Sequence, residues 1–191
     1  MRYLLAPFML LLVAACSTIS IGAVAALRGV DPLTADPAQF QLVSSSPQTV
    51  QLDPAGQKLT LSATRGETGQ RIEEQFILDR LAIGSSSLRG IKPAEGENLY
   101  LYQMAQQDLD RYMRMQTELQ SWKTGSVRDK NNLSLGVQAS GCIVAGTSKE
   151  DRLATFWLSV DQGDSFMPLV KNVDLVDIAR EAGLSENIQT C

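Results

Sequence analysis

The chain has 191 residues, of which 44% are hydrophobic, and a formal net charge of −4. This length and apolar fraction suit one globular domain with its own core. The acidic balance argues against nucleic acid or anionic lipid headgroups as electrostatic partners. The sequence contains no histidine, which excludes Ser-His-Asp and Cys-His catalysis, histidine metal ligands and the usual near-neutral general base.

The N-terminus has the layout of a bacterial export signal. Arg2 and the free amino group supply positive charge, and an almost wholly apolar run follows from Leu4 to Val13. This run is too short to span a bilayer unaided, and small residues come after it. We therefore predict that residues 1–15 are a signal peptide.

The residues at the end of this segment resemble the lipobox of bacterial lipoproteins, namely Val13, Ala14, Ala15 and Cys16. In that family the cysteine thiol receives diacylglycerol, the chain is cut just before it, and the new amino terminus is usually acylated, for example with palmitate. The resemblance implies lipidation of Cys16 and a firm anchor, because each buried methylene contributes about 0.8 kcal/mol. In the same family, a residue other than aspartate at the position of Ser17 implies the outer membrane, facing the periplasm.

A single-pass signal anchor is the alternative interpretation of this segment. The stretch Ile19 to Leu27 is again mainly apolar, so Tyr3 to Leu27 would form one uncleaved span that ends at Arg28. Several residues interrupt the apolar character of that span: Pro7, Ser17, Thr18, Ser20 and Gly22. These interruptions favour lipidation over the signal anchor.

The two cysteines that remain after Cys16 are Cys142 and Cys191. An exported chain enters an oxidising compartment, and an even remainder there indicates a Cys142–Cys191 disulfide. The alternative is that Cys142 is a buried small hydrophobic residue and Cys191 a free terminal thiol.

We divide the mature chain into a lipid-anchored tether, residues 16–38, and a single globular domain, residues 39–191. Two Asp-Pro steps near residues 31–37 disfavour helix there. This stretch is interpreted either as a stiff spacer or as a packed first loop of the domain. The combination of lipobox and Val-Asp-Pro-Leu-Thr-Ala-Asp-Pro also resembles small uncharacterised lipoproteins of alphaproteobacteria, which implies no activity.

Alternating apolar residues predict about seven short strands, with turns between them. The first half is expected to contain Phe40–Leu52 with a break near Ser44–Pro47, then Lys58–Thr64, Gln70–Leu81 and Leu99–Tyr102. The second half is expected to contain Leu133–Ala139, which resumes at Cys142–Ala145, and then Arg152–Val160 and Ser165–Val170. Glu74 interrupts the apolar face of Gln70–Leu81.

Two helices are predicted. Ala105–Trp122 has an apolar stripe at helical spacing and Gly125 just beyond its end; the stripe consists of Ala105, Leu109, Tyr112, Met113 and Leu119. A short final helix, Leu175–Ala182, is capped by Asp174. Because strands follow turns rather than alternate with helices, we expect an α+β fold: a mostly antiparallel, two-layer or sandwich-like sheet covered by the long helix.

Candidate chemistry in this sequence is sparse. Neighbouring carboxylates occur at Glu73/Glu74, Asp108/Asp110, Asp161/Asp164 and Asp174/Asp177. Sequence neighbours do not establish the flanking pair that a glycosidase needs. Ser85–Ser87 lies in the long polar connection Ile83–Asn98, which is interpreted as a flexible loop rather than as the site of a nucleophile.

We therefore expect a lipid-anchored, non-catalytic binding or structural module on the periplasmic side of a bacterial membrane. No catalytic residue, metal or cofactor is predicted. Its expected partners are the membrane, through the lipid, and an unidentified envelope protein or cell-wall component, but not nucleic acid. A carboxylate-based, histidine-free envelope hydrolase, with Ile83–Asn98 as a lid, is the alternative.

Overall fold

The computed structural model describes residues 19–21, 31–66, 68–84, 88–122, 131–177 and 190–191. The main helix is α1, Gln106–Ser121, and the short 3-10 helices are η1, Pro37–Gln39, and η3, Glu150–Arg152. The strands are β1 (Ile19–Ile21), β2 (Gln41–Pro47), β3 (Val50–Leu52), β4 (Lys58–Thr64), β5 (Arg71–Leu81), β6 (Glu97–Met104), β7 (Asn132–Ala139), β8 (Gly141–Ile143), β9 (Leu153–Ser159) and β10 (Met167–Asp174).

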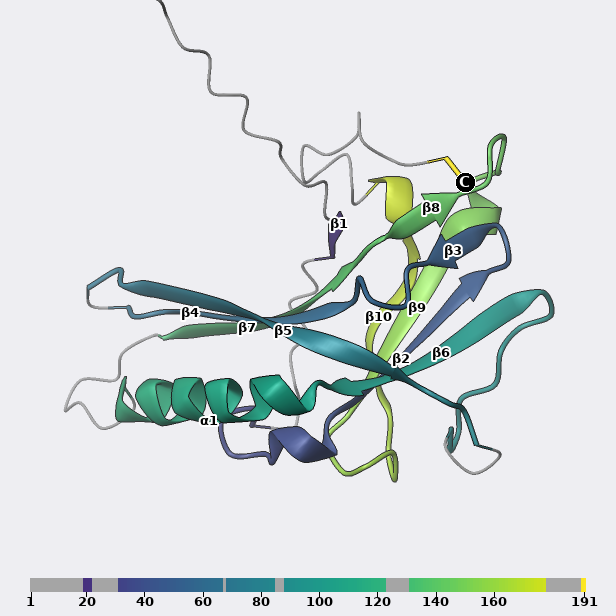
Figure 1. Cartoon of the computed structure of the whole chain (residues 1–191). Coiled ribbons are helices and arrows are strands. Elements are labelled where there is room, and N and C mark those ends of the chain that lie inside the picture. The colour runs from purple at the N-terminus through teal and green to yellow at the C-terminus, as the bar shows by residue number, and fades with distance from the viewer. Residues whose placement is uncertain (1–18, 22–30, 67, 85–87, 123–130, 178–189) are drawn as a thin grey trace, which may run out of the picture.

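The strands form an eight-stranded antiparallel sheet and a small two-stranded sheet (Figure 1). The strand order in the large sheet is β1-β7-β4-β5-β6-β2-β9-β10, and β3 pairs with β8. The long strand β5 changes partner along its length, because Arg71–Ile77 pairs with β4 and Leu78–Leu81 pairs with β6. The sheet therefore curls at this strand.

The small sheet joins the two halves of the curled sheet. β3 follows β2 and β8 follows β7, so the β3–β8 pairing connects a strand from each half. In Figure 1 the β3–β8 pair and β1 lie at the top, whereas α1 runs beneath β4, β5 and β7. The concave face and the helix enclose the main core.

The core forms because alternate strand residues point inward. Leu59, Leu61 and Ala63 are buried along β4, as the alternating pattern predicts. Tyr112 of α1 packs edge-on against Phe40 and Phe76, with ring centroids 5.4 and 4.9 Å apart. Burial of each large apolar side chain stabilises the fold by about 1.5–3 kcal/mol.

The predicted fold class, α+β with a mostly antiparallel sheet and one long helix, is confirmed. Two local predictions differ from the structure. Ser44–Ser46 is buried inside β2, and the break falls instead at Gln48 and Thr49. On α1, Met113 is 44% exposed while Met115 is buried, because the apolar stripe follows Leu109, Tyr112, Met115 and Leu119.

The stretch before β2 is a packed first loop and not a free spacer. Leu33 is buried in the main core. The Tyr112 hydroxyl donates to Pro32 O at 3.2 Å, and Gln116 Nε2 donates to Pro32 O and Ala35 O at 2.8 Å each. Side chains of α1 thus satisfy the backbone carbonyls of a turn that has no strand partner.

The C-terminal end returns to the small sheet. Asp174 Oδ1 accepts the Val176 N–H at 2.9 Å, as an N-cap does, and a helix starts at Leu175. The continuation of that helix beyond residue 177 and the predicted stop at Gly125 lie outside the described residues. Thr190 pairs with Ile143 of β8.

Candidate functional site: a polar groove between β5 and α1

The candidate site lies where β6 passes directly into α1. Ala105, the N-cap residue, donates its N–H to Ile77 O at 2.9 Å, which extends the β5–β6 pairing by one bond. The next group on the β5 edge, the Ile77 N–H, has no strand beside it. The Asp108 carboxylate accepts this N–H at 2.6 Å, and the Asp108 side chain is only 9% exposed. The Asp108 side chain thus accepts the hydrogen bond that a neighbouring strand would otherwise accept, and so acts as a substitute strand.

Arg111 contacts the next backbone group along the same edge of β5. It donates through Nη2 to Gln75 O. The same guanidinium lies 3.1 Å from Asp108 Oδ1 and 3.4 Å from Glu74 Oε2. Its carbon lies 4.9 Å from the centroid of the Phe76 ring, within cation–π range. Arg111 therefore connects two carboxylates, a strand carbonyl and the core.

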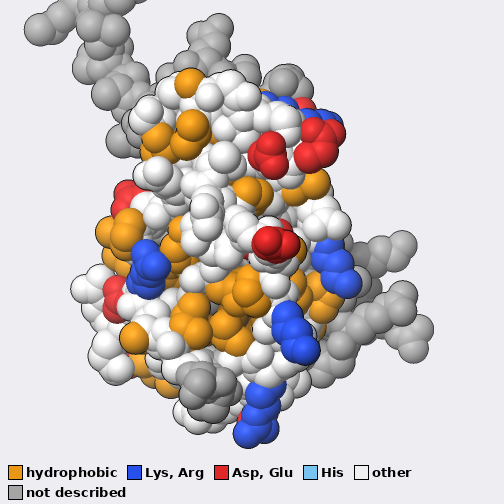
Figure 2. Space-filling model, turned by 90° about the vertical axis from the view of Figure 1, so that its right-hand side faces the viewer, with side chains coloured by type: hydrophobic (Ala, Val, Ile, Leu, Met, Phe, Trp, Pro, Cys, Tyr) orange, Lys and Arg blue, Asp and Glu red, His pale blue; other side chains and the backbone are white. Residues whose placement is uncertain are grey.

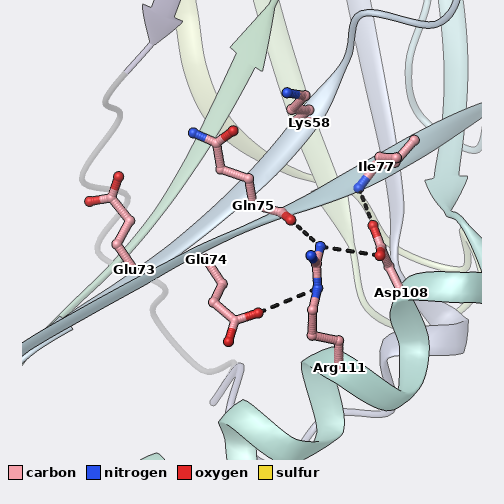
Figure 3. A pocket seen from close by; sticks show the side chains of 7 residues that line it. All are labelled: Lys58, Glu73, Glu74, Gln75, Ile77, Asp108 and Arg111. Atoms are coloured by element: carbon pink, nitrogen blue, oxygen red, sulfur yellow. Dashed lines mark hydrogen bonds and ion pairs between the residues drawn. The ribbon is translucent and has the colours of Figure 1, made fainter.

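A groove of about 510 Å³ opens around these contacts, lined by Lys58, Glu73, Glu74, Gln75, Ile77, Asp108 and Arg111. Figure 3 shows Glu74 and Asp108 pointing toward Arg111, whereas Glu73 points away from it. Glu73 pairs with Arg71 at 2.5 Å instead. Within the part of the chain that the structure describes, Lys58 makes no ion pair, and it contributes a cation to the lining of the groove.

The arrangement favours binding over acid–base chemistry. A general acid or base must exchange a proton with a substrate, so its carboxylate has to be accessible and suitably poised. Asp108 already accepts from Ile77 and Arg111, and Glu74 faces the same guanidinium. The groove instead offers Lys58 and the exposed parts of Arg111 and Glu74 as polar contacts.

Most of the other neighbouring carboxylates form hydrogen bonds or ion pairs with nearby side chains in the described residues. Asp161 accepts from the Ser159 and Ser165 hydroxyls at 2.6 Å each, inside the β9–β10 turn. Asp164 pairs with Arg89 at 3.0 Å, and Asp110 is exposed on α1. The C-terminal pair is held by cations: Arg152 lies 3.0 Å from Asp174, and Lys149 lies 2.7 Å from Asp177. Of the neighbouring carboxylates noted in the sequence, Glu73, Glu74 and Asp108 line the groove, and the others are not among its lining residues.

The resolved pKa shifts all move groups away from neutral pH. Hydrogen bonds from Ser159 and Ser165 lower the pKa of Asp161 to about 2. Burial raises the pKa of Tyr102 to about 12 and also raises the pKa of Tyr112. The hydrogen bond to Asp177 raises the pKa of Lys149. Catalytic acids and bases need the opposite, a pKa moved toward the working pH.

The predicted cysteine sites are placed only in part. Cys142 and Cys191 form the expected disulfide, with sulfur atoms 2.11 Å apart and Cα atoms 5.1 Å apart. Cys16 and Ser85–Ser87 lie outside the described residues. Arg111 and Lys58 were not recognised as site residues from the sequence. The available signal was Glu74, a carboxylate on the otherwise apolar face of β5, because a partly buried carboxylate on such a face is stabilised by a cationic partner.

A second surface feature covers the convex face of the sheet. A small apolar cluster consists of buried Val43, Ile91 and Leu101, with half-buried Leu81, Leu88, Leu99, Trp157 and Phe166 packed against it. In Figure 2 hydrophobic side chains gather in the middle of one face, with lysine and arginine side chains around them. The ion pair of Arg89 with Asp164 joins the β5–β6 connection to the β9–β10 turn beside this cluster. The cluster thus fixes that connection on the sheet.

Comparison with known proteins found no matching family model, no matching curated protein and no matching solved structure. No helix within the described ranges is long and apolar enough to cross a membrane. In the same ranges no group of three or more cysteine, aspartate or glutamate residues is arranged to hold a metal ion.

Proposed function

We propose that this protein is a lipid-anchored binding module of the bacterial envelope, held on the periplasmic side of the outer membrane by acyl chains on Cys16. The groove between β5 and α1 is its binding site, and it carries no catalytic activity. The observation that carries this proposal is the Arg111 contact set. Arg111 neutralises Asp108 and Glu74, the two carboxylates that point toward its guanidinium in the groove.

Two further observations support the envelope address. The export signal and lipobox resemblance end at Cys16, and the remaining two cysteines are joined. Disulfides persist in oxidising compartments such as the periplasm and are rare in the cytosol. A partner in that compartment would be an envelope protein or a cell-wall component with polar groups that match Lys58, Glu74 and Arg111.

The address is tested by intact mass of the membrane-extracted chain, compared with Cys16→Ser. The proposal expects the unsubstituted chain to begin at Cys16 and to carry acyl mass. The Cys16→Ser chain should retain residues 1–15 and gain no lipid. If both chains are processed identically, the lipid anchor is wrong and the signal-anchor alternative is favoured.

The binding site is tested by a photo-crosslinking amino acid placed at Lys58 in the groove and, as a matched control, at Lys171. Lys171 is an exposed lysine on β10, an edge strand of the sheet, and does not line the groove. We expect a discrete adduct in intact cells from position 58 and none from position 171. The same adducts at both positions, or none at either, would contradict a specific groove.

The absence of catalysis is tested separately, by complementation of a deletion strain. Asp108→Asn keeps an oxygen acceptor for the Ile77 N–H but removes the carboxylate, and Asp110→Ala and Asp164→Ala remove exposed carboxylates. A binding module should complement fully with Asp110→Ala and Asp164→Ala, which lie outside the groove, and Asp108→Asn should lower complementation only as far as it lowers crosslinking from position 58. Loss of complementation by Asp108→Asn at normal abundance with crosslinking intact, or by either of the other two variants, would favour the carboxylate hydrolase.

A further inference from the structure

The pairing of β1 with β7 restricts how the domain can sit on a membrane. Ile19 lies opposite Ala139, and Ile21 lies opposite Val137. Because the two strands are antiparallel, the N-terminal end of β1 lies at the C-terminal end of β7. There the chain continues through Ser140 into β8.

The covalent distance from this point to the lipid is short. Cys16 precedes Ile19 by three residues, and three residues span at most about 11 Å even when fully extended. An acylated Cys16 therefore keeps Ile19 within about 11 Å of the bilayer surface. The end of β7 lies one strand spacing, about 5 Å, further away, provided that β1 stays paired. A free tether extending to residue 31 would impose no such limit.

The surface around the end of β7 is formed by the small sheet and the turn beside it. Asp53 N–H donates to Ser140 O at 2.9 Å, which places the exposed turn residues Pro54 and Ala55 next to this point. Beyond β8, Val144 is 40% exposed, and its N–H donates to Thr49 O at 2.9 Å. Among the described residues, this end thus presents the small and apolar side chains of Pro54, Ala55 and Val144, with the exposed carboxylates of Asp53 and Asp151 beside them.

We infer that the β3–β8 end of the domain rests on the bilayer that carries the lipid anchor, so that the opposite end, with α1 and the end of β5, faces the periplasm. In Figure 1 this places the bilayer at the top of the view. The inference rests on the proposed lipidation of Cys16. It adds that the short link to β1 turns a flexible anchor into a fixed orientation.

The test is quenching of an introduced tryptophan by brominated acyl chains, in the acylated full chain reconstituted into phospholipid nanodiscs. Val144→Trp reports on the β8 end. Ile83→Trp is the matched control, because Ile83 is similarly exposed, at 43%, and follows the end of β5. The unsubstituted chain, with Trp122 buried and Trp157 half-buried, gives the background.

We expect brominated lipid to remove most of the emission added by Val144→Trp and to leave that of Ile83→Trp unchanged. A flexible Gly/Ser insertion of roughly a dozen residues between Thr18 and Ile19 should add roughly 20 Å of reach and abolish the quenching at position 144. Equal quenching at both positions, preferential quenching at 83, or no effect of the insertion would each overturn the orientation.

The outcome also separates this inference from the proposed anchor. If intact mass shows acylation but position 144 is not quenched, the anchor stands and the orientation is wrong. If the chain carries no acyl mass, the anchor fails and the orientation fails with it.

Discussion

The Asp108 carboxylate accepts the Ile77 backbone N–H at 2.6 Å, at the position where β6 leaves the edge of β5. The same carboxylate lies 3.1 Å from the Arg111 guanidinium. One side chain thus satisfies a strand edge and orients the cation that lines the groove. Burial of this carboxylate is tolerated because both of its oxygens have partners.

We predict that Asp108→Ala destabilises the fold by about 2–3 kcal/mol, because it leaves the Ile77 N–H and Arg111 without their acceptor. Asp108→Asn should lose less, about 1 kcal/mol, since an amide oxygen still accepts from Ile77. Asp110→Ala, an exposed neighbour on the same helix, should change stability by no more than about 0.5 kcal/mol. Urea unfolding of the three variants measures this, and equal losses at 108 and 110 would contradict the substitute-strand role.

Gln116 is predicted to hold the first loop on the helix. Its Nε2 donates to Pro32 O and Ala35 O at 2.8 Å each. Gln116→Ala should destabilise by about 1–3 kcal/mol, because Ala35 O loses the Gln116 donor and Pro32 O keeps only the Tyr112 hydroxyl. Amide hydrogen exchange should also rise across residues 33–40 before it rises elsewhere. The exposed Thr117→Ala is the control, and unchanged exchange in Gln116→Ala would mean that the packing of Leu33 and the remaining hydrogen bonds from Tyr112 and Gln120 are enough to fix the loop.

The sequence was sufficient to predict the elements whose pattern is local. Lys58–Thr64 and Leu133–Ala139 alternate cleanly because each strand has one buried face, and the long helix has a continuous apolar stripe. The groove was not predictable, because Arg111 and Glu74 meet only after β5 and α1 pack together. Ser44–Ser46 was mistaken for a break, since three consecutive serines favour turns unless neighbouring strands on both sides bury them.

The β9–β10 turn is predicted to be sensitive to acid through Asp161. Hydrogen bonds from Ser159 and Ser165 lower the pKa of its carboxyl from 3.8 to about 2. A depressed pKa in the folded state means that the contribution to stability is present above the unfolded value and is lost as pH falls through the folded value. The stability advantage of the unsubstituted chain over Asp161→Asn should therefore be constant above about pH 5 and shrink between about pH 4 and pH 2.

Chemical unfolding at a series of pH values measures this dependence. Asp164→Asn is the control, because its carboxylate is exposed and pairs with Arg89, which is exposed as well. If the Asp161→Asn chain keeps the full acid dependence of the unsubstituted chain in that window, the turn hydrogen bonds do not produce it.

Loss of the disulfide is predicted to destabilise the domain by about 2–4 kcal/mol, because the bond closes a long loop in the unfolded chain. Cys142 and Cys191 are 49 positions apart in sequence. The double substitution Cys142→Ser, Cys191→Ser should shift the urea midpoint downward, and reductant should then have no additional effect. Reductant alone should shift the midpoint of the unsubstituted chain by the same amount, which serves as the control for the two substitutions. An unchanged midpoint would show that the disulfide adds nothing to the stability of the folded domain.

Gly141 is predicted to be irreplaceable at the start of β8, because β3 passes too close for a side chain. A Cβ at this position would lie 2.3 Å from Gln51 O and 3.0 Å from Leu52 Cα. These are backbone atoms, so Gly141→Ala must separate the two strands and should destabilise by about 1–3 kcal/mol. Gly146→Ala is the control, since no atom lies within 4 Å of its Cβ although its φ is +76°, and it should lose only about 1 kcal/mol.

Amide hydrogen exchange distinguishes the backbone clash expected in Gly141→Ala from the φ strain expected in Gly146→Ala. Gly141→Ala should accelerate exchange of the Val144 N–H, which donates to Thr49 O across the small sheet. Gly146→Ala should leave that amide protected, because its strain is confined to the loop after β8. Since β3 and β8 connect the two halves of the curled sheet, opening them should also lower the protection of β7. Protection of β7 that is unaffected by Gly141→Ala would show that the two halves are held together by the main core alone.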